Sequence, residues 1–293
     1  MKKIAIATLL AATTMVATAQ VSLNGKISEF VDNTKTGAIS KTTLVTDPTS
    51  NITISVNENI GGLKARVVLD TSLKANDPIT GADTKLGDRQ STIGLASKLG
   101  SVDLGRNLHS HFLAITNNDA FATLYGSVAG DVHNLRGLRI SNGTFFALTP
   151  INGVTATYDR TQTGAGTEAA SYSASAKLFG INATVAQYTQ GAEKSTVYAG
   201  SAKLGATQVF YSHSDDKGLV AKTGDLIGAS QAFGAVTAKA SYGKTNTNVK
   251  AYAMGADYNF SKRTAVGVNY RNVDAAGTAS DVKQVGVGVT HRF

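Results

Sequence analysis

The segment VGVGVTHRF, residues 285–293, decides how the fold is interpreted. One parity carries Val285, Val287, Val289, His291 and Phe293, and the other carries Gly286, Gly288, Thr290 and Arg292. An alternation of period two with β-branched residues is typical of a strand. The ends of soluble domains are more often polar and frayed. The segment therefore predicts a terminal strand that is held in place and finishes on an aromatic anchor.

The same alternation recurs along the chain. In RTAVGVNYR (263–271), Val266, Val268 and Tyr270 share one parity, whereas Asn269 and Arg271 share the other. Further segments of this kind are SYSASAKLFG (171–180), AVTAKASYG (235–243) and KAYAMGADYNF (250–260). Each segment is a weak signal by itself, so the prediction of an all-β chain rests on the repetition.

Breaks between these segments alternate between short and long. Short turns are expected at residues 59–64, 98–103, 149–154, 178–183, 203–208, 232–237 and 259–264. Longer polar breaks are expected near 32–49, 74–88, 109–135, 161–168, 189–194, 214–219, 244–249 and 273–281. This rhythm predicts sixteen strands with both chain ends on the short-turn side. Strands of about 9–11 residues suffice to cross a membrane as a barrel.

Composition narrows the class of protein. The chain has no Cys, 3 Pro and 30 Gly, with a net charge of +8. An exported protein without Cys has no disulfides to stabilise it. No segment after the N-terminus approaches the ~18 consecutive apolar residues of a membrane-spanning helix. Basic residues are interleaved with acids rather than clustered with stacking aromatics, which argues against nucleic acid as a partner.

The N-terminal stretch MKKIAIATLLAATTMVATAQ has two Lys, an apolar run and the small-residue motif Ala17-Thr18-Ala19. This pattern predicts a signal peptide at 1–19, cleaved after Ala19, rather than a membrane anchor, because the apolar run is short of the ~20 residues that span a bilayer. We expect residues 20–293 to form one domain. Removing Lys2 and Lys3 would leave a net charge of +6.

The two faces of the predicted strands differ in kind. One carries Val, Ala, Leu and Tyr, with aromatics near strand ends, and the other carries small polar residues with scattered charges of both signs. A soluble sandwich would show the same alternation. The aromatic positions and the polar face favour a membrane barrel with a water-filled lumen. In a closed barrel the last strand pairs with the first, because lipid offers no partner for an open edge.

Four motifs support a resemblance to a known family. They are DRQSTIGLASKLGSVDLGRN (88–107), ENIGGLKARV (58–67), RISNGTFFALTPINGV (139–154) and the terminal VTHRF. With them the chain resembles the general diffusion porins of Gram-negative outer membranes, most closely the beta-proteobacterial, Neisseria-like type. The resemblance implies a transmembrane antiparallel β-barrel that passes ions and small hydrophilic solutes passively. It implies no cofactor. It also implies a homotrimer surrounded by outer-membrane lipid and lipopolysaccharide, and assembly machinery that reads Phe293 and His291.

The resemblance also implies a constriction. In that family the third extracellular loop folds into the lumen and places acids opposite basic wall residues. The long break at 109–135 matches this loop, and its acids are Asp119 and Asp131. The basic wall residues carried over by position are Arg106, Arg139, Arg66, Lys64 and Arg89. Asn51 departs from the pattern, since the family often has Arg there. The positive net charge hints at a preference for anions.

Competing chemistry is weak in this sequence. His109, His111 and His133 suggest a metal site, but no Cys or carboxylate stands at ligand spacing. His213 with Asp215 and Asp216 is the best candidate for a lipase- or protease-type site at the barrel rim, although a solvated hairpin tip is the favoured explanation. A surface β-adhesin is the third alternative. No P-loop, dinucleotide fingerprint or His-Glu-x-x-His motif is present.

Overall fold

The computed structural model describes residues 19–74, 85–161, 168–218, 221–275 and 281–293. The expected signal peptide, apart from its last residue, lies outside these ranges. The strand segments are β1 (Gln20–Thr36), β2 (Ile39–Thr46), β3 (Asn51–Ile60), β4 (Leu63–Ser72), β5 (Gln90–Ala96), β6 (Gly100–Leu108), β7 (Arg139–Leu148), β8 (Val154–Thr161), β9 (Ala169–Leu178), β10 (Ile181–Gln190), β11 (Glu193–Leu204), β12 (Thr207–Lys217), β13 (Lys222–Phe233), β14 (Val236–Thr245), β15 (Lys250–Asn259), β16 (Thr264–Asp274) and β17 (Val282–Arg292). Two short helices, α2 (Ser110–Thr116) and α3 (Ala129–Val132), lie between β6 and β7.

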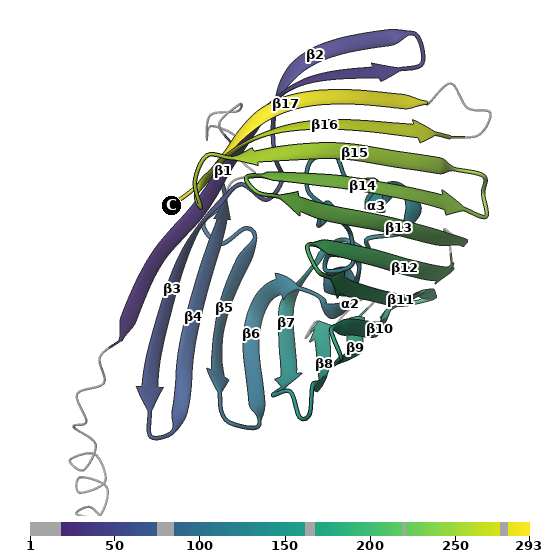
Figure 1. Ribbon diagram of the computed structural model, residues 1–293. Coiled ribbons are helices and arrows are strands. Elements are labelled where there is room, and N and C mark those ends of the chain that lie inside the picture. Colours follow the sequence, from purple (N-terminus) through teal and green to yellow (C-terminus); the bar gives the residue numbers. More distant parts are fainter. Residues whose placement is uncertain (1–18, 75–84, 162–167, 219–220, 276–280) are drawn as a thin grey trace, which may run out of the picture.

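The strands form one antiparallel sheet that closes on itself (Figure 1). Closure comes from β1, which pairs with β17 over eleven residues, from Lys26–Arg292 to Thr36–Val282. β2 and β3 are two halves of one barrel strand, because both pair with β1 and are separated by a short break at 47–50. The barrel therefore has sixteen strands, as the rhythm of turns predicts, and no strand of the sheet is left with an open edge.

The register separates an apolar outer face from a polar inner face. Val268 lies opposite Val287 on the outside, and their exposed fractions are 48% and 52%. Asn269, one residue away, faces inward and is 5% exposed. An apolar row in contact with the surroundings and a polar row around the lumen are what a membrane barrel requires. Among the described residues, no helix has the length and apolar character needed to cross a bilayer.

Three of the expected long loops are strand instead. The break expected at 32–49 is a tight hairpin centred on Gly37, where β1 and β2 extend to residues 36 and 39. The breaks expected at 189–194 and 214–219 lie largely within β10, β11 and β12. These segments are polar on both parities because they extend beyond the membrane on the long-loop side. Polarity alone therefore did not mark the end of a strand.

Phe293 completes the closure of the barrel. Its N–H donates to the Gly25 carbonyl, and the Gly25 N–H donates back to the Phe293 carbonyl, each over 3.0 Å. The Phe293 ring lies over Gly25, where a Cβ atom would clash with it. The side chain of His291 also contacts a neighbouring strand, since its Nδ1 lies 3.0 Å from the Thr264 hydroxyl on β16. The terminal aromatic thus covers a gap that glycine leaves in the first strand.

Deleting Phe293 is expected to lower the yield of folded, heat-modifiable protein. The deletion removes two interstrand hydrogen bonds and a ring contact, and hydrogen bonds alone account for about 1–3 kcal/mol. The measurement is the ratio of the compact band to the heat-denatured band on a polyacrylamide gel after refolding in detergent. Phe293→Tyr keeps the ring and the backbone bonds and serves as the control. An unchanged yield after the deletion would contradict this role.

Candidate pore constriction

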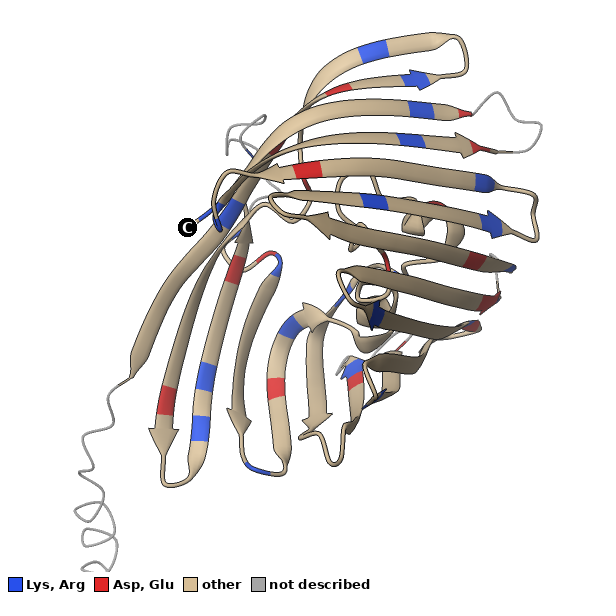
Figure 2. Cartoon of the chain, viewed as in Figure 1, with Lys and Arg blue, Asp and Glu red and all other residues tan. Residues whose placement is uncertain are grey.

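The chain between β6 and β7 enters the lumen and lies against its inner wall (Figures 1 and 2). α2 contacts β8 to β11, and α3 contacts β13 to β15. Ile115, Val128 and Val132 are fully buried against apolar wall residues such as Val197 and Leu226. This inward loop, residues 109–138, therefore occupies one side of the lumen and leaves the β3–β7 side open.

Polar contacts fix the start of the inward loop. The Ser110 N–H donates to Asp159 over 2.6 Å, and the His111 N–H donates to the Ser171 hydroxyl over 2.9 Å. His109 caps α2, because its Nδ1 accepts from the Phe112 N–H. These contacts join α2 to β8 and β9.

The middle of the inward loop is held by the opposite part of the barrel. The Tyr125 N–H donates to Asp47 over 2.8 Å, the Tyr125 hydroxyl donates to Asp32, and its ring stacks on Phe30 at 4.0 Å. Asp47 lies in the break between β2 and β3, which turns its carboxylate toward the lumen. Lys26 pairs with the same carboxylate at 3.2 Å. The break is therefore an anchor for the loop rather than an irregularity.

The end of the inward loop, around α3, is held by contacts with the barrel wall. His133 lies between the hydroxyls of Ser212 and Ser214, at 2.8 and 2.9 Å. Asp131 accepts from Arg271 with both oxygens at 2.7 Å. Val132 fits against Gly224 and Gly243, where any Cβ atom would overlap it. Small residues on β13 and β14 thus let the loop approach the wall closely.

Three loop histidines are buried without access to solvent. Burial lowers the pKa of His109 to about 4 and those of His111 and His133 to about 3. Nearby groups that carry or gain positive charge oppose protonation further, namely His109 and Arg136 beside His111, and Lys222 beside His133. All three are therefore neutral at pH 7, and each bonds to a hydroxyl or backbone group. Among the described residues, no three His, Cys, Asp or Glu side chains are grouped to hold a metal.

The two loop acids do not face the basic wall residues as expected. Asp119 is 4% exposed and accepts from the N–H of Thr123 at 2.8 Å and from the Ser127 hydroxyl at 2.6 Å. Asp131 is paired with Arg271 behind the loop, and burial raises its pKa despite that partner. The residues that the loop leaves exposed, among them Leu113, Asn117 and Ala122, carry no charge. The exposed surface of the inward loop itself is therefore neutral.

Asp119→Asn is expected to weaken the inward loop and leave ion selectivity nearly unchanged. The amide accepts fewer hydrogen bonds than the carboxylate, and leaving buried donors without acceptors costs about 1–3 kcal/mol. Thermal unfolding in detergent measures the loss, and the reversal potential in a salt gradient measures selectivity. A large shift of reversal potential with unchanged stability would place the Asp119 carboxylate in the lumen after all.

Three arginines lie near one another at the long-loop end of the β5–β7 part of the barrel. Arg89 pairs with Asp70 at 2.9 Å, and Asn51 donates to the same carboxylate at 2.6 Å. Arg106 donates to the Asp88 carbonyl at 2.7 Å and to the Ser141 hydroxyl. Arg139 lies within electrostatic range of Arg89 and Arg106. Neither Arg106 nor Arg139 has an ion-pair partner among the described residues.

The other two predicted wall residues lie closer to the short turns. Arg66 pairs with Asp103 across β4 to β6, at an Nε–Oδ1 distance of 2.7 Å. Lys64 is exposed, two residues beyond the Gly61–Gly62 turn. Neither contacts Asp119 or Asp131. The structure thus gathers Arg89, Arg106 and Arg139 and leaves Arg66 and Lys64 apart.

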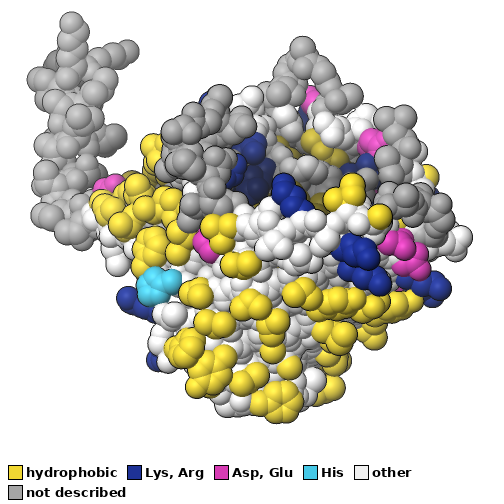
Figure 3. Space-filling view, turned by 90° about the horizontal axis from the view of Figure 1, so that it is seen from above, with side chains coloured by type: hydrophobic (Ala, Val, Ile, Leu, Met, Phe, Trp, Pro, Cys, Tyr) yellow, Lys and Arg dark blue, Asp and Glu magenta, His cyan; other side chains and the backbone are white. Residues whose placement is uncertain are grey.

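Several lumen charges lie outside the predicted constriction set. Arg271 holds the inward loop, and Lys239 pairs with Asp257 at 2.5 Å below it. Strand parity predicts that these side chains point inward, since each shares that face with small polar residues, but it does not predict their partners. Figure 3 shows Lys and Arg side chains gathered in the hollow at the top of the molecule and hydrophobic side chains over the outer wall.

The rim candidate for an enzyme does not assemble. His213 faces outward and contacts Asp225 at 2.9 Å. Asp216 faces inward and pairs with Arg136 at 3.5 Å. Asp215 pairs instead with Lys217 at 3.6 Å. Asp216 therefore lies on the opposite side of the wall from His213 and Asp215, and His213 contacts Asp225 rather than either predicted acid.

Solved structures share this architecture. An anion-selective porin from Comamonas acidovorans superposes with a TM-score of 0.79 at 20% identity, covering 94% of this chain and 100% of that one. A loop-deletion mutant of OmpT from Vibrio cholerae gives 0.72 at 12% identity, covering 94% and 99%. A mutant of Rhodopseudomonas blastica porin gives 0.71 at 18% identity, covering 94% and 100%. A search of curated proteins found no match.

The family profile described as Gram-negative porin matches residues 7–293. The closed sixteen-stranded barrel, its polar lumen and its inward loop agree with that match. The chain therefore belongs to the Gram-negative porin family, whose members are non-enzymatic diffusion channels of the outer membrane.

Proposed function

We propose that this porin prefers anions and works as a homotrimer of the beta-proteobacterial type. One observation supports the selectivity above all: the acids of the inward loop are engaged with the loop itself and the wall behind it, whereas Arg106 and Arg139 lie near the long-loop end without an ion-pair partner among the described residues. An excess of positive charge at a narrow place raises the local concentration of anions. The Comamonas structure, named as an anion-selective porin, agrees with this preference.

The test of selectivity is a reversal potential. Purified protein in a planar bilayer under a tenfold KCl gradient should give stepwise conductance and a potential displaced toward that of chloride. Because lumen charges are screened by salt, the displacement should shrink when both solutions contain 1 M salt. A potential displaced toward that of potassium would refute anion preference but leave the diffusion channel intact.

The outer surface supports a trimer. Exposed hydrophobic side chains on β7 to β16 include many rings, among them Tyr158, Tyr211 and Tyr252, whereas those on β17 and β1 to β6 are aliphatic, with Phe293 at the end of β17 as the exposed ring beside them. Glu29 also faces outward on β1, where it accepts from the Thr46 hydroxyl. A lipid-facing wall should carry an aromatic girdle and avoid acids. We therefore assign the β17–β6 sector to contact between subunits.

The absence of native Cys makes this assignment testable. Native mass spectrometry should give three chains per particle. A maleimide that partitions into the membrane should label Val287→Cys slowly in the assembled protein and Tyr252→Cys rapidly. Equal labelling of the two variants would place both faces in lipid and would argue against the proposed interface.

The proposed assignment to the beta-proteobacterial type rests on the motif at residues 88–107, which covers β5, the turn after it and most of β6. Its Leu-Gly-Arg ending places Arg106 beside the bulge between β6 and β7. The bulge is where Arg106 reaches Ser141. The motif thus supports the same arginine cluster that carries the proposed selectivity.

A further inference from the structure

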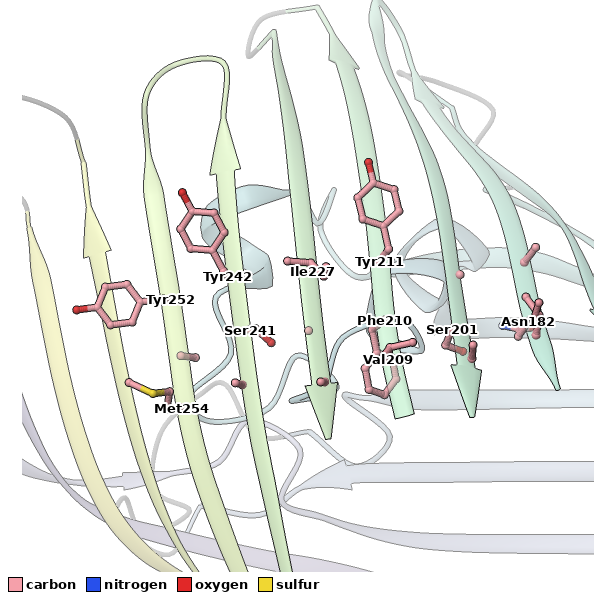
Figure 4. A pocket seen from close by; sticks show the side chains of 18 residues that line it. Asn182, Ser201, Val209, Phe210, Tyr211, Ile227, Ser241, Tyr242, Tyr252 and Met254 are labelled. Carbon is pink, nitrogen blue, oxygen red and sulfur yellow. The ribbon is translucent and has the colours of Figure 1, made fainter. Parts of the chain in front are cut away.

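Two hollows in the described part of the barrel differ in the side chains that line them. One, of about 620 Å³, lies on the outer wall over β10 to β15, where apolar side chains such as Ile227 and Met254 line it (Figure 4). That hollow faces the bilayer, and its apolar lining needs no other occupant. The other, of about 440 Å³, lies between the end of the inward loop and the long-loop ends of β7 to β10.

The second hollow, called the mouth cavity below, has the size of a small-molecule site, which is typically about 300–1,000 Å³. Polar and aromatic side chains line it, among them Arg136, Arg139, Asn142, Thr161, Tyr188 and Gln190. They come from five segments of the chain, so the cavity exists only in the folded barrel.

The backbone beside the mouth cavity is strained. Arg136, Leu138 and Asn142 have φ values of 51°, 62° and 50°, which residues other than Gly rarely adopt. Arg136 and Asn142 line the cavity, and Leu138 lies between them in sequence. Such conformations persist only where the surrounding structure enforces them, and they gather at ligand sites. The strain therefore marks the cavity as more than a packing defect.

The guanidinium of Arg139 lines the mouth cavity without a partner. Its Nε is buried, and no group among the described residues accepts a hydrogen bond from its side chain. Asp70 acts on it electrostatically but is paired with Arg89. Asp88 acts on it too, and both of its carboxylate oxygens accept from Ser72. A half-buried guanidinium without an acceptor is costly, and an oxyanion that accepts from it removes that cost.

Arg136 lines the same cavity with a charge that is already balanced. It pairs with Glu193 and, at 3.5 Å, with Asp216, and its side chain is 7% exposed. Its Nε is buried and has no acceptor in the described part of the chain. Because the charge is balanced, a neutral acceptor such as a hydroxyl oxygen suits this N–H better than a second anion does.

Neutral polar side chains complete the lining. The Gln190 amide oxygen accepts from the Tyr188 hydroxyl at 3.0 Å, which leaves the amide N–H groups of Gln190 to donate. Asn142 offers a second amide, and Thr161 offers a hydroxyl. An inorganic anion would engage Arg139 and leave these groups without a role. A ligand with one carboxylate and several hydroxyl groups would engage all of them.

We propose that the mouth cavity binds a sugar acid, with its carboxylate at Arg139 and its hydroxyl groups at Asn142 and Gln190. This inference rests on the anion preference proposed above and names a class of solute that it serves. A hexuronate carries one carboxylate on a ring of hydroxyl groups, which matches one unpartnered guanidinium among neutral polar groups. Binding here concentrates the solute beside the inward loop, and weak binding permits its release into the lumen.

Binding is measured by isothermal titration calorimetry on the purified full protein in detergent at low salt. The probes are D-glucuronate, D-glucose, which has the ring without the carboxylate, and acetate, which has the carboxylate without the ring. We expect D-glucuronate to bind about tenfold more tightly than either of the others, since only it makes both kinds of contact.

Two substitutions test the contacts one at a time. Arg139→Lys keeps the charge but lacks the planar fork that pairs with both oxygens of a carboxylate, so we expect D-glucuronate to bind about fivefold more weakly. Arg106→Lys makes the same exchange in the same arginine cluster, outside the lining of the cavity, and should leave D-glucuronate affinity unchanged. Asn142→Gly removes the amide and relieves the positive φ, so affinity should fall about threefold while thermal stability rises.

Three results would overturn the sugar-acid site. D-glucuronate bound no better than acetate would show that the hydroxyl groups are not recognised. Equal losses in Arg139→Lys and Arg106→Lys would show that the cluster acts only as a diffuse charge. Unchanged affinity in Asn142→Gly would show that its strained backbone serves packing alone. A channel that prefers chloride to potassium but gives any of these results would retain the anion preference and lose the site.

Discussion

Replacing Arg106 and Arg139 together by Gln is expected to reduce anion preference about sevenfold at low salt. Each charge lies at the long-loop end of the barrel and has no ion-pair partner among the described residues. A unit charge about 7 Å from a permeating ion contributes about 0.6 kcal/mol at the dielectric constant of water. Two such charges contribute about 1.2 kcal/mol, which corresponds to the sevenfold change. The permeability ratio of chloride to potassium, from reversal potentials, measures it.

Lys64→Gln is the control for this experiment. It removes one positive charge from the same wall, but Lys64 is exposed two residues from a short turn. We expect a smaller effect for each charge removed, because counter-ions screen a charge at a wide vestibule. Charge reversal with Arg106→Glu and Arg139→Glu should invert the preference. If Lys64→Gln changed the permeability ratio as much as Arg139→Gln, bulk charge rather than the arginine cluster would set selectivity.

Acidification is expected to release the inward loop from the wall. The pKa is about 4 for His109 and about 3 for His111 and His133 in the docked loop, whereas an exposed His has a pKa of about 6.5. Between these values the undocked loop binds more protons, so the free energy of docking falls as pH decreases from about 6.5 toward 4. At pH 5 the loss is roughly 2 kcal/mol for each histidine. Single-channel records should show added noise and long closures at pH 5 that are absent at pH 7.5.

A variant without two of the three buried histidines separates this effect from general acid denaturation. His111→Gln/His133→Gln keeps a donor and an acceptor beside Ser195, Ser212 and Ser214. We expect far fewer long closures at pH 5 than in the unchanged protein, with only the contribution of His109 left. His213→Gln alters an outward histidine and should keep the full acid response. The same response in both variants would exclude the buried histidines as its source.

The barrel follows from local patterns in the sequence. Alternation in RTAVGVNYR and VGVGVTHRF predicts two strands, and their register in the structure pairs the same apolar parities. Each strand needs only period-two patterning and a turn, so short windows carry the information. The break between β2 and β3 was not predictable in this way, because Asp47 and Ser50 are explained by contacts with segments far away in sequence.

The constriction was predicted in part. Resemblance located the loop and the arginines, but it placed Asp119 and Asp131 opposite them. The partners of these acids are Ser127, within the loop, and Arg271, 140 residues away. One signal was present: Val197 and Leu226 are apolar on an inward parity that is otherwise polar, and they mark where the loop packs. Choosing which acid meets which cation required the three-dimensional register.

The anchors of the inward loop also constrain the order of folding. They extend from Asp32 on β1 to Arg271 on β16, and we expect them to meet only after β1 has paired with β17. Contacts of such long sequence separation form late, because the chain must first close large loops. The narrow part of the lumen, which the inward loop borders, therefore takes its final shape last. A newly inserted barrel should pass through a wide, leaky stage, and a cell that assembles this porin must tolerate or shield that stage.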